Sequence, residues 1–258
     1  MARGRVWVGD EHRAIFRLYC STPFGRLHSG NPEIIEIAER IGRTPSAVAM
    51  KACNFASLDP AFLRTGRSGL GNASNADKVL LQEFLADSAR IAEEVEAAYQ
   101  RVMQRNDDTS DVEPEVFPPD GPTEVERLVK TRRVQQFFRN AVLATYSNRC
   151  ALTGISRSEL LVASHIIPWS QNHARRADPR NGLCLNSLHD RAFDQGLLTF
   201  DSDYRVIVSE ELLDQKSLSN EAKAFLAVEG QQLELPERFR PDPDALAYHR
   251  AEIFRGTV

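Results

Sequence analysis

The sequence predicts an α+β fold, in which a linker joins a helical N-terminal region to a C-terminal region of short strands and helices. Three observations support this prediction. Apolar residues recur at helical spacing through the first hundred residues. An acidic, proline-rich segment without that periodicity follows. Beyond it, short apolar runs are separated by turn residues, as strands are. We therefore expect a helical domain at 1–103, a linker at 104–126 and a second domain at 127–258.

Composition excludes several classes of protein. Of the 258 residues, 42% are hydrophobic and 26% are charged, as in an ordinary globular protein. No apolar run approaches the ~20 residues that a membrane-spanning helix needs, and the first residues lack the apolar core of a secretory signal. We expect a cytoplasmic protein with no membrane partner. The four cysteines are scattered without a Cys-x-x-Cys pair, which excludes a four-cysteine zinc site.

Helices of the N-terminal region are marked by their start signals. A first helix is expected at Asp10–Tyr19. Asn31-Pro32 and Thr44-Pro45 are N-cap and first-turn pairs that open two further short helices, separated by a turn at Gly42. Two short helices joined in this way predict a helix-turn-helix unit. The side chains expected to face a DNA major groove are Arg43, Ser46, Lys51 and Asn54. In the alternative, the unit only packs or dimerises.

Two more helical segments follow. One block at Asn75–Gln104 is expected to serve packing or dimerisation. A basic amphipathic helix is expected at Glu124–Tyr146. Its candidate phosphate contacts are Arg132, Arg133 and Arg139, for which a solvated surface position is the alternative. The net charge of −4 argues mildly against a nucleic-acid partner, but local basic patches matter more when the ligand is a polyanion.

The candidate chemistry begins at His165, in the phrase Ser-His-Ile-Ile-Pro-Trp. The apolar residues before it suit one strand and Pro168 ends the next, so His165 is expected at a hairpin. Downstream, Asn181-Gly182 is expected to form a turn before a short strand. A helix beginning near Asn186 or Ser187 would then place two carboxylates, those of Asp190 and Asp194, one turn apart on one face.

These residue types match the needs of phosphodiester hydrolysis. A base must deprotonate water, and a cation must stabilise the developing negative charge. Neutral imidazole is available near pH 7, which makes His165 the candidate base. Asp190, with Asp194 or His189, would hold a divalent cation, and Asn181 would brace the loop or orient His165. In the polar loop after Trp169, Arg175 and Arg176 are expected to contact phosphate; these are the last of the candidate DNA-binding residues.

The order of these motifs resembles that of the HNH nuclease superfamily, most closely the branch found in bacterial restriction endonucleases. The motifs are HIIPW, then N-G-L-x-L, then L-H-D-x-x-F-D-x-G-L, preceded by the phrase RCALTG. The resemblance implies a ββα-metal domain and a divalent cofactor, Mg²⁺ first, with Mn²⁺ or Ni²⁺ as alternatives. By the same resemblance, His165 is the general base, Asn181 the middle asparagine and Asp190 the final position of the motif, with Asp194 as a further ligand.

Two departures from the family pattern bear on the site. Many members carry Asp or His as a metal ligand immediately before the base, where this chain has Ser164. Many also hold a zinc ion with four cysteines. Those four positions are Cys150, Thr153, Asn186 and His189 in this chain, so we expect hydrogen bonds and packing in its place. His189 therefore has two candidate roles, one catalytic or metal-binding and one structural.

Three functions remain open at this point. The leading hypothesis is a metal-dependent endonuclease of restriction or defence type that cuts double-stranded DNA. It would act as a homodimer, because a single HNH site cuts one strand. The second is a non-catalytic helix-turn-helix DNA-binding regulator with a relic HNH domain. The third is a toxin-like nuclease with an RNA substrate. A modification-dependent enzyme is one version of the leading hypothesis, although these residues predict no aromatic cage or pocket for a flipped base.

Overall fold

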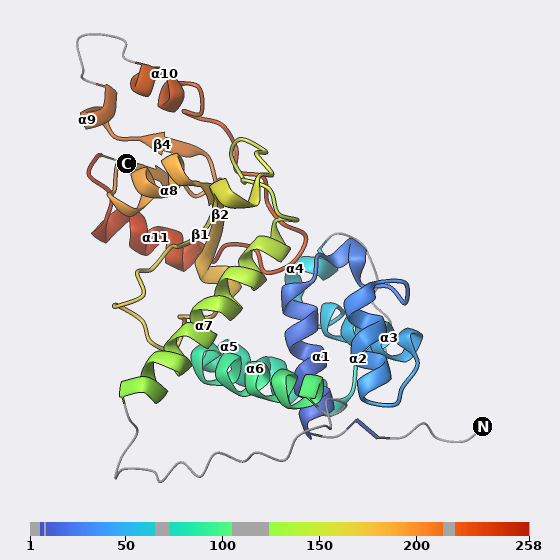
Figure 1. Ribbon diagram of the computed structural model, residues 1–258. Helices are drawn as coiled ribbons and strands as arrows, with labels where there is room; N and C mark the ends of the chain where they lie inside the picture. The colour runs from blue at the N-terminus through green and yellow to red at the C-terminus, as the bar shows by residue number, and fades with distance from the viewer. Residues whose placement is uncertain (1–5, 8, 65–72, 105–123, 214–219, 258) are drawn as a thin grey trace.

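The computed structural model describes residues 6–7, 9–64, 73–104, 124–213 and 220–257 (Figure 1). Nearly all of the linker predicted at 104–126 lies outside these residues. The elements divide as predicted, with helices in the N-terminal part and a mixture of helices and small sheets in the C-terminal part. The predicted α+β class is therefore confirmed.

The N-terminal part is a group of helices whose starts follow from local side-chain caps. Its elements are α1 (Gly9–Ser21), the 3-10 turn η1 (Phe24–Arg26), α2 (Pro32–Arg40), α3 (Pro45–Ala56), α4 (Pro60–Leu63), α5 (Asn75–Ala86) and α6 (Ser88–Gln104). The Asn31 side chain accepts a hydrogen bond from the backbone N–H of Glu33, and Thr44 accepts one from that of Ala47. Each cap satisfies a backbone donor that the first turn leaves unpaired.

One prediction for this part is wrong. The block expected at Asn75–Gln104 is two helices, because the chain leaves helical geometry at Asp87, where φ is −146° and ψ is 82°. Ser74 and Asp77 form a capping box that starts α5. Ser88, directly after the break, then begins α6.

Helix α7 (Glu124–Thr145) lies between the other N-terminal helices and the C-terminal part (Figure 1). It contributes side chains to two hydrophobic cores. Phe137 and Ala141 belong to the core of the N-terminal helices. Phe138 and Val142 belong to the core of the C-terminal part. Positions offset by one residue point about 100° apart on a helix, so a single helix presents one apolar stripe to each core.

The C-terminal part contains two small antiparallel sheets and short helices. Its elements are η2 (Ser158–Leu160), β1 (Leu161–His165), η3 (Pro179–Asn181), β2 (Gly182–Asn186), α8 (Ser187–Asp194), β3 (Leu198–Phe200), β4 (Val206–Val208), α9 (Glu210–Leu213), α10 (Asn220–Leu226) and α11 (Pro243–Glu252). Strand β1 pairs with β2, and β3 pairs with β4. Asn186 caps α8 by accepting hydrogen bonds from the backbone N–H groups of Leu188 and His189, so the start predicted for this helix is confirmed.

Three local predictions near the site are wrong. His165 is the last residue of β1 and pairs with Gly182 of β2, so it does not lie in a hairpin turn. Pro168 ends no strand; a long loop runs from Ile166 to the next 3-10 turn. Asn181-Gly182 is not a turn either, because η3 ends at Asn181 and Gly182 has the extended φ of −136°. Glycine is needed at this position because helix α7 packs closely against it.

Arg238, from the segment before α11, joins the two parts of the molecule. Its side chain is 1% exposed and donates hydrogen bonds to the backbone carbonyls of Tyr19, Cys20 and Thr22. Carbonyls at the end of a helix such as α1 have no partner within the helix. A residue of the C-terminal part therefore caps a helix of the N-terminal part. No helix in the described parts of the chain has both the length and the apolar character needed to cross a membrane.

Candidate active site

A cavity of about 400 Å³ lies where β1 meets α8. Ser164 and His165 line it from the strand, and Asp190 and Asp194 line it from the helix. His249 of α11 closes part of its wall. The structure thus brings together the candidate base and both candidate metal ligands, although 25 residues separate His165 from Asp190 along the chain.

The His165 ring is held on three sides. It stacks on Phe138 of α7, with ring centroids 3.7 Å apart and planes 14° from parallel. The Trp169 ring meets it edge-on at 5.6 Å. Nε2 lies 3.0 Å from the backbone carbonyl of Arg176. A carbonyl can only accept, so Nε2 carries the proton and Nδ1 keeps its lone pair.

The charge state of His165 also suits a base. Burial lowers the pKa of its imidazole, and the hydrogen bond to the Arg176 carbonyl offsets this only in part. The ring is therefore neutral at pH 7, with Nδ1 as the atom that can take a proton.

The two carboxylates are close enough to affect each other. Burial raises the pKa of Asp190, although the neighbouring Ser164 hydroxyl and the charge of Arg191 lower it in part. Burial raises the pKa of Asp194 to about 6, and the neighbouring charge of Asp190 contributes to the rise. The charge of Arg191 lowers both pKa values in part, but no ion pair between either carboxylate and another described residue is within bonding distance. A cation between them would offset the cost of keeping both charged in the cavity.

These side chains fit a hard divalent cation. Carboxylate and hydroxyl oxygens are the ligands that Mg²⁺ prefers, and Asp190, Asp194 and Ser164 supply them from one wall of the cavity. Across the described residues, no group of three or more His, Cys, Asp and Glu side chains could hold a metal. The remaining coordination positions would fall to water and to phosphate oxygens, as is usual for Mg²⁺.

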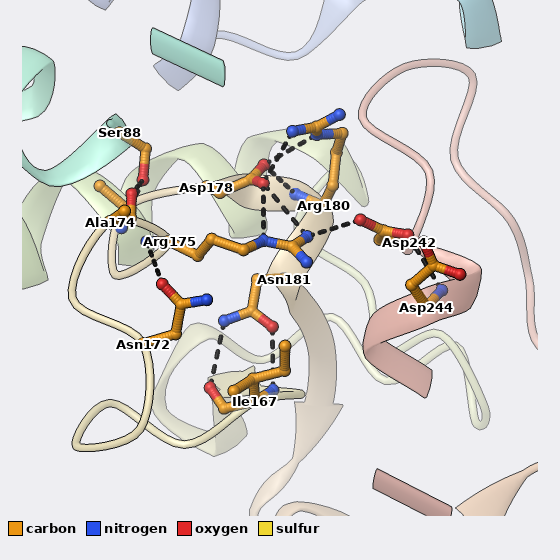
Figure 2. Close-up of polar contacts among 11 residues, drawn as sticks. Ser88, Ile167, Asn172, Ala174, Arg175, Asp178, Arg180, Asn181, Asp242 and Asp244 are labelled. Atoms are coloured by element: carbon orange, nitrogen blue, oxygen red, sulfur yellow. Dashed lines mark hydrogen bonds and ion pairs between the residues drawn. The ribbon is translucent and has the colours of Figure 1, made fainter. Parts of the chain in front are cut away.

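Asn181 braces the loop that follows His165. Its side-chain oxygen accepts a hydrogen bond from the backbone N–H of Ile167 at 2.8 Å, and its amide nitrogen donates to the carbonyl of Ile167 at 3.1 Å (Figure 2). The backbone carbonyl of Asn181 also accepts from the N–H of Ile166. Of the two roles expected for Asn181, the structure places the side chain in the first, on the loop.

His189 lies in a separate polar cluster. It is 3% exposed and does not line the cavity. The side-chain nitrogen of Asn186 lies 3.1 Å from His189 Nδ1, 3.2 Å from Thr153 Oγ1 and 3.8 Å from Cys150 Sγ. Burial opposes ionisation of the Cys150 thiol, but the neighbouring His189 and Thr153 outweigh it and lower its pKa to about 6. Hydrogen bonds connect these four positions, as the sequence predicts.

The two arginines expected to contact phosphate from the loop are engaged within it. Arg175 pairs with Asp178 at 3.2 Å and with Asp242 at 2.8 Å (Figure 2). Arg176 donates to the carbonyl of Trp169 at 2.8 Å and lies over its ring, 4.7 Å from the centroid. A phosphate contact by either arginine would have to share or replace these bonds.

The residues expected to face a major groove are not presented together. Arg43 pairs with Glu11 at 3.0 Å. Lys51 is 5% exposed and pairs with the buried Asp77 at 2.5 Å. Asn54 is buried, so Ser46 is the exposed member of the set.

The predicted phosphate contacts on α7 have three different surroundings. Arg132 is exposed. Arg133 donates to the side chain of Gln100 at 3.0 Å. Arg139 lines a smaller cavity of about 220 Å³ to which His165 and Trp169 also contribute. Arg139 is therefore the one of the three that lies next to the candidate active site.

Asp178 has a role that the sequence analysis missed. Its buried carboxylate accepts hydrogen bonds from the backbone N–H of Arg180 at 2.9 Å, from the Arg180 side chain at 3.0 Å and from Arg175 at 3.3 Å (Figure 2). The available signal was the pair Asp178-Pro179, an N-cap followed by proline at the first helical position. His249, which the sequence analysis did not single out, also lines the cavity, but the Thr199 hydroxyl and the Phe193 carbonyl engage both of its ring nitrogens.

Comparison with known proteins bears on the same segment. Residues 150–201 match a family model described as HNH endonuclease. The match covers about a fifth of the chain and contains β1, β2 and α8, together with His165, Asn181, Asp190 and Asp194. No curated protein matches the chain.

Proposed function

Since residues 150–201 carry a domain of the HNH endonuclease family, we propose that the protein is a metal-dependent endonuclease that hydrolyses phosphodiester bonds in DNA. One observation carries the proposal. A neutral imidazole with a defined tautomer lines the same cavity as two neighbouring carboxylates, one of which has its pKa raised to about 6 by burial and by the charge of the other. A base and a cation site side by side are what phosphodiester hydrolysis requires.

Each residue has a distinct part in the proposed reaction. Nδ1 of His165 takes the proton of the attacking water, and its Nε2–H stays on the Arg176 carbonyl. Asn181 fixes the loop beside the base. Asp190 and Asp194 would hold the divalent cation, which when bound supplies positive charge for the phosphate oxygens. We assign His189 the structural one of its two candidate roles, because its contacts lie in the cluster with Asn186 and Cys150.

The substrate is proposed to be double-stranded DNA, in a restriction or defence role. One cavity of this kind cuts one strand, so a double-strand break requires two copies, which favours a homodimer. Arg139, beside His165, is the best-placed candidate for a phosphate contact next to the site of cleavage. Dependence on a base modification is tested by comparing the cleavage of modified and unmodified plasmids.

Cleavage of supercoiled plasmid tests the proposal. Modified and unmodified plasmids are incubated with Mg²⁺, Mn²⁺, Ni²⁺ or EDTA. We expect metal-dependent nicking or linearisation that is lost in His165→Ala and in Asp190→Asn. The controls are His28→Ala and Asp203→Asn, which remove the same groups from exposed positions. Undiminished cleavage by His165→Ala, or cleavage in EDTA, would contradict the proposal; digestion of RNA in preference to DNA would change the substrate.

A non-catalytic DNA-binding regulator is a second candidate function. The observation that favours it is the small number of metal ligands, since Ser164 stands where many HNH domains have Asp or His and the described residues supply no third His, Cys, Asp or Glu. DNA binding that persists in His165→Ala, together with no cleavage by the unsubstituted protein under any metal, would establish this function instead.

A further inference from the structure

Ser88, the first residue of α6, is bonded to the loop that follows β1 (Figure 2). Its backbone N–H and its hydroxyl both donate to the carbonyl of Ala174, each at 2.8 Å. Its hydroxyl oxygen in turn accepts from the N–H of Ala177 at 3.1 Å. Ser88 is 1% exposed, so no water can replace these bonds without rearrangement. A helix of the N-terminal part therefore holds two points of a loop that lies 86 residues further along the chain.

Between these two points lies the carbonyl that orients the candidate base. Arg176 follows Ala174 by two residues and precedes Ala177. Its carbonyl oxygen lies 3.0 Å from His165 Nε2 and sets the tautomer of that ring. Any shift of the segment between the two Ser88 contacts moves this oxygen relative to the imidazole.

The loop is fixed from its other end by contacts within the C-terminal part. Asp178 binds Arg175 and Arg180, and Asn181 binds both backbone groups of Ile167. Ala177 itself is fully buried and belongs to the core of the N-terminal helices. Among the described residues of the N-terminal part, Ser88 is the one whose side chain forms hydrogen bonds with the segment that carries the Arg176 carbonyl.

We propose that Ser88 is a positioning residue for His165, through which the N-terminal helices set the tautomer and orientation of the base. This inference rests on the proposed function only where it takes His165 as the catalytic base. The link from Ser88 to the imidazole ring rests on the hydrogen bonds described above. In Ser88→Ala the N–H of Ala177 loses its acceptor and the Ala174 carbonyl loses one donor, both in a buried place. We expect the segment to relax and the bond to His165 Nε2 to loosen.

The direct test is nitrogen NMR of His165 in the full-length protein. The imidazole ¹⁵N shifts report which nitrogen carries the proton, whether or not the protein cleaves DNA. We expect a single Nε2–H tautomer in the unsubstituted protein and an exchanging mixture in Ser88→Ala. Ser88→Thr, which keeps the hydroxyl, is expected to show the single Nε2–H tautomer of the unsubstituted protein. Ser57→Ala is the matched control, because it removes a hydroxyl bonded only to a carbonyl of α3, that of Asn54.

A kinetic test accompanies it. Misplacing a catalytic group by about 1 Å can lower the rate by up to ~100-fold, so we expect at least a ~10-fold fall in kcat for Ser88→Ala with KM changed less than ~2-fold. If Ser88→Ala does not fold, Ser88→Cys, which has similar volume and weaker hydrogen bonds, takes its place and should give an intermediate tautomer mixture. An unchanged tautomer in Ser88→Ala, or an equal change in Ser57→Ala, overturns the inference. Failure of the proposed function appears elsewhere, as full cleavage by His165→Ala.

Discussion

Gly182 lies where α7 crosses the strand next to the candidate active site, and replacing it by alanine tests the close packing there. A Cβ atom at this position would lie 2.4 Å from Cγ2 of Val142 and 2.9 Å from Cζ of Phe138. Carbon atoms in contact lie about 3.5–4.0 Å apart, so one side must move by about 1 Å. Helix α7 is packed on its other face against the N-terminal core and cannot simply shift outward. We expect Gly182→Ala to lower the free energy of unfolding by about 1–3 kcal/mol, the usual range for overpacking.

Urea denaturation followed by tryptophan fluorescence measures this change. Gly25→Ala is the matched control, because a Cβ there meets no atom within 4 Å; we expect its effect to stay within about 0.5 kcal/mol. Adding Val142→Ala to Gly182→Ala removes the shortest contact, so the two substitutions should be less harmful together than the sum of their separate effects. The packing argument is refuted if Gly182→Ala changes the unfolding free energy by less than about 0.5 kcal/mol, or if the two effects are additive.

Three further predictions concern buried polar side chains. Burial lowers the pKa of His249 to about 4, below its unfolded value of about 6.5. The folded protein therefore keeps its full stability above pH 6.5 and loses part of it as the pH falls towards 4, because the unfolded chain takes up the proton more readily. The loss amounts to about 3 kcal/mol at most. Urea titrations at several pH values should therefore show a flatter profile for His249→Gln, and an equally steep one contradicts the reasoning. Asp77→Asn leaves the buried Lys51 ammonium without its 2.5 Å partner and should lower the free energy of unfolding by about 3–5 kcal/mol. The double variant Asp77→Asn with Lys51→Met should lose less, and an equal loss in both variants would contradict a stabilising role for the ion pair. Arg238→Met removes the donors that cap α1 and should lower the thermal midpoint by several degrees, which calorimetry can detect; an unchanged midpoint would mean that water caps the helix equally well.

Local chemistry made parts of this structure predictable. Asn31, Thr44 and Asn186 each satisfy backbone donors of the turn that follows them, so the helices they start could be predicted from short stretches of sequence. The spacing of Asp190 and Asp194 needed only the pitch of one helix to place both carboxylates on the same face. The two carboxylates assigned on the basis of this helical spacing do line the same cavity.

Long-range contacts account for what the sequence did not reveal. Arg43 and Lys51 have the spacing of groove-facing side chains, yet their partners are Glu11 and Asp77, 32 and 26 residues away. The hairpin expected at His165 failed because its pairing partner lies beyond a long loop and not beside it in sequence. These ion pairs and this strand pairing leave no periodic signal in the sequence, because the packing of whole elements determines which residues meet.

Because helix α7 contributes to both hydrophobic cores, it limits where two related genes could recombine within this region. Its stripes for the two cores, one with Phe137 and one with Phe138, overlap along the same stretch of helix. Inserting or deleting one residue within this stretch would rotate the part of both stripes on one side of the change about 100° away from its core, whereas a change of seven residues nearly preserves the rotation. A different N-terminal region could therefore be fused to the C-terminal part only if the phase of the shared helix is retained. Crossovers that exchange N-terminal regions are expected to fall before α7, not within it.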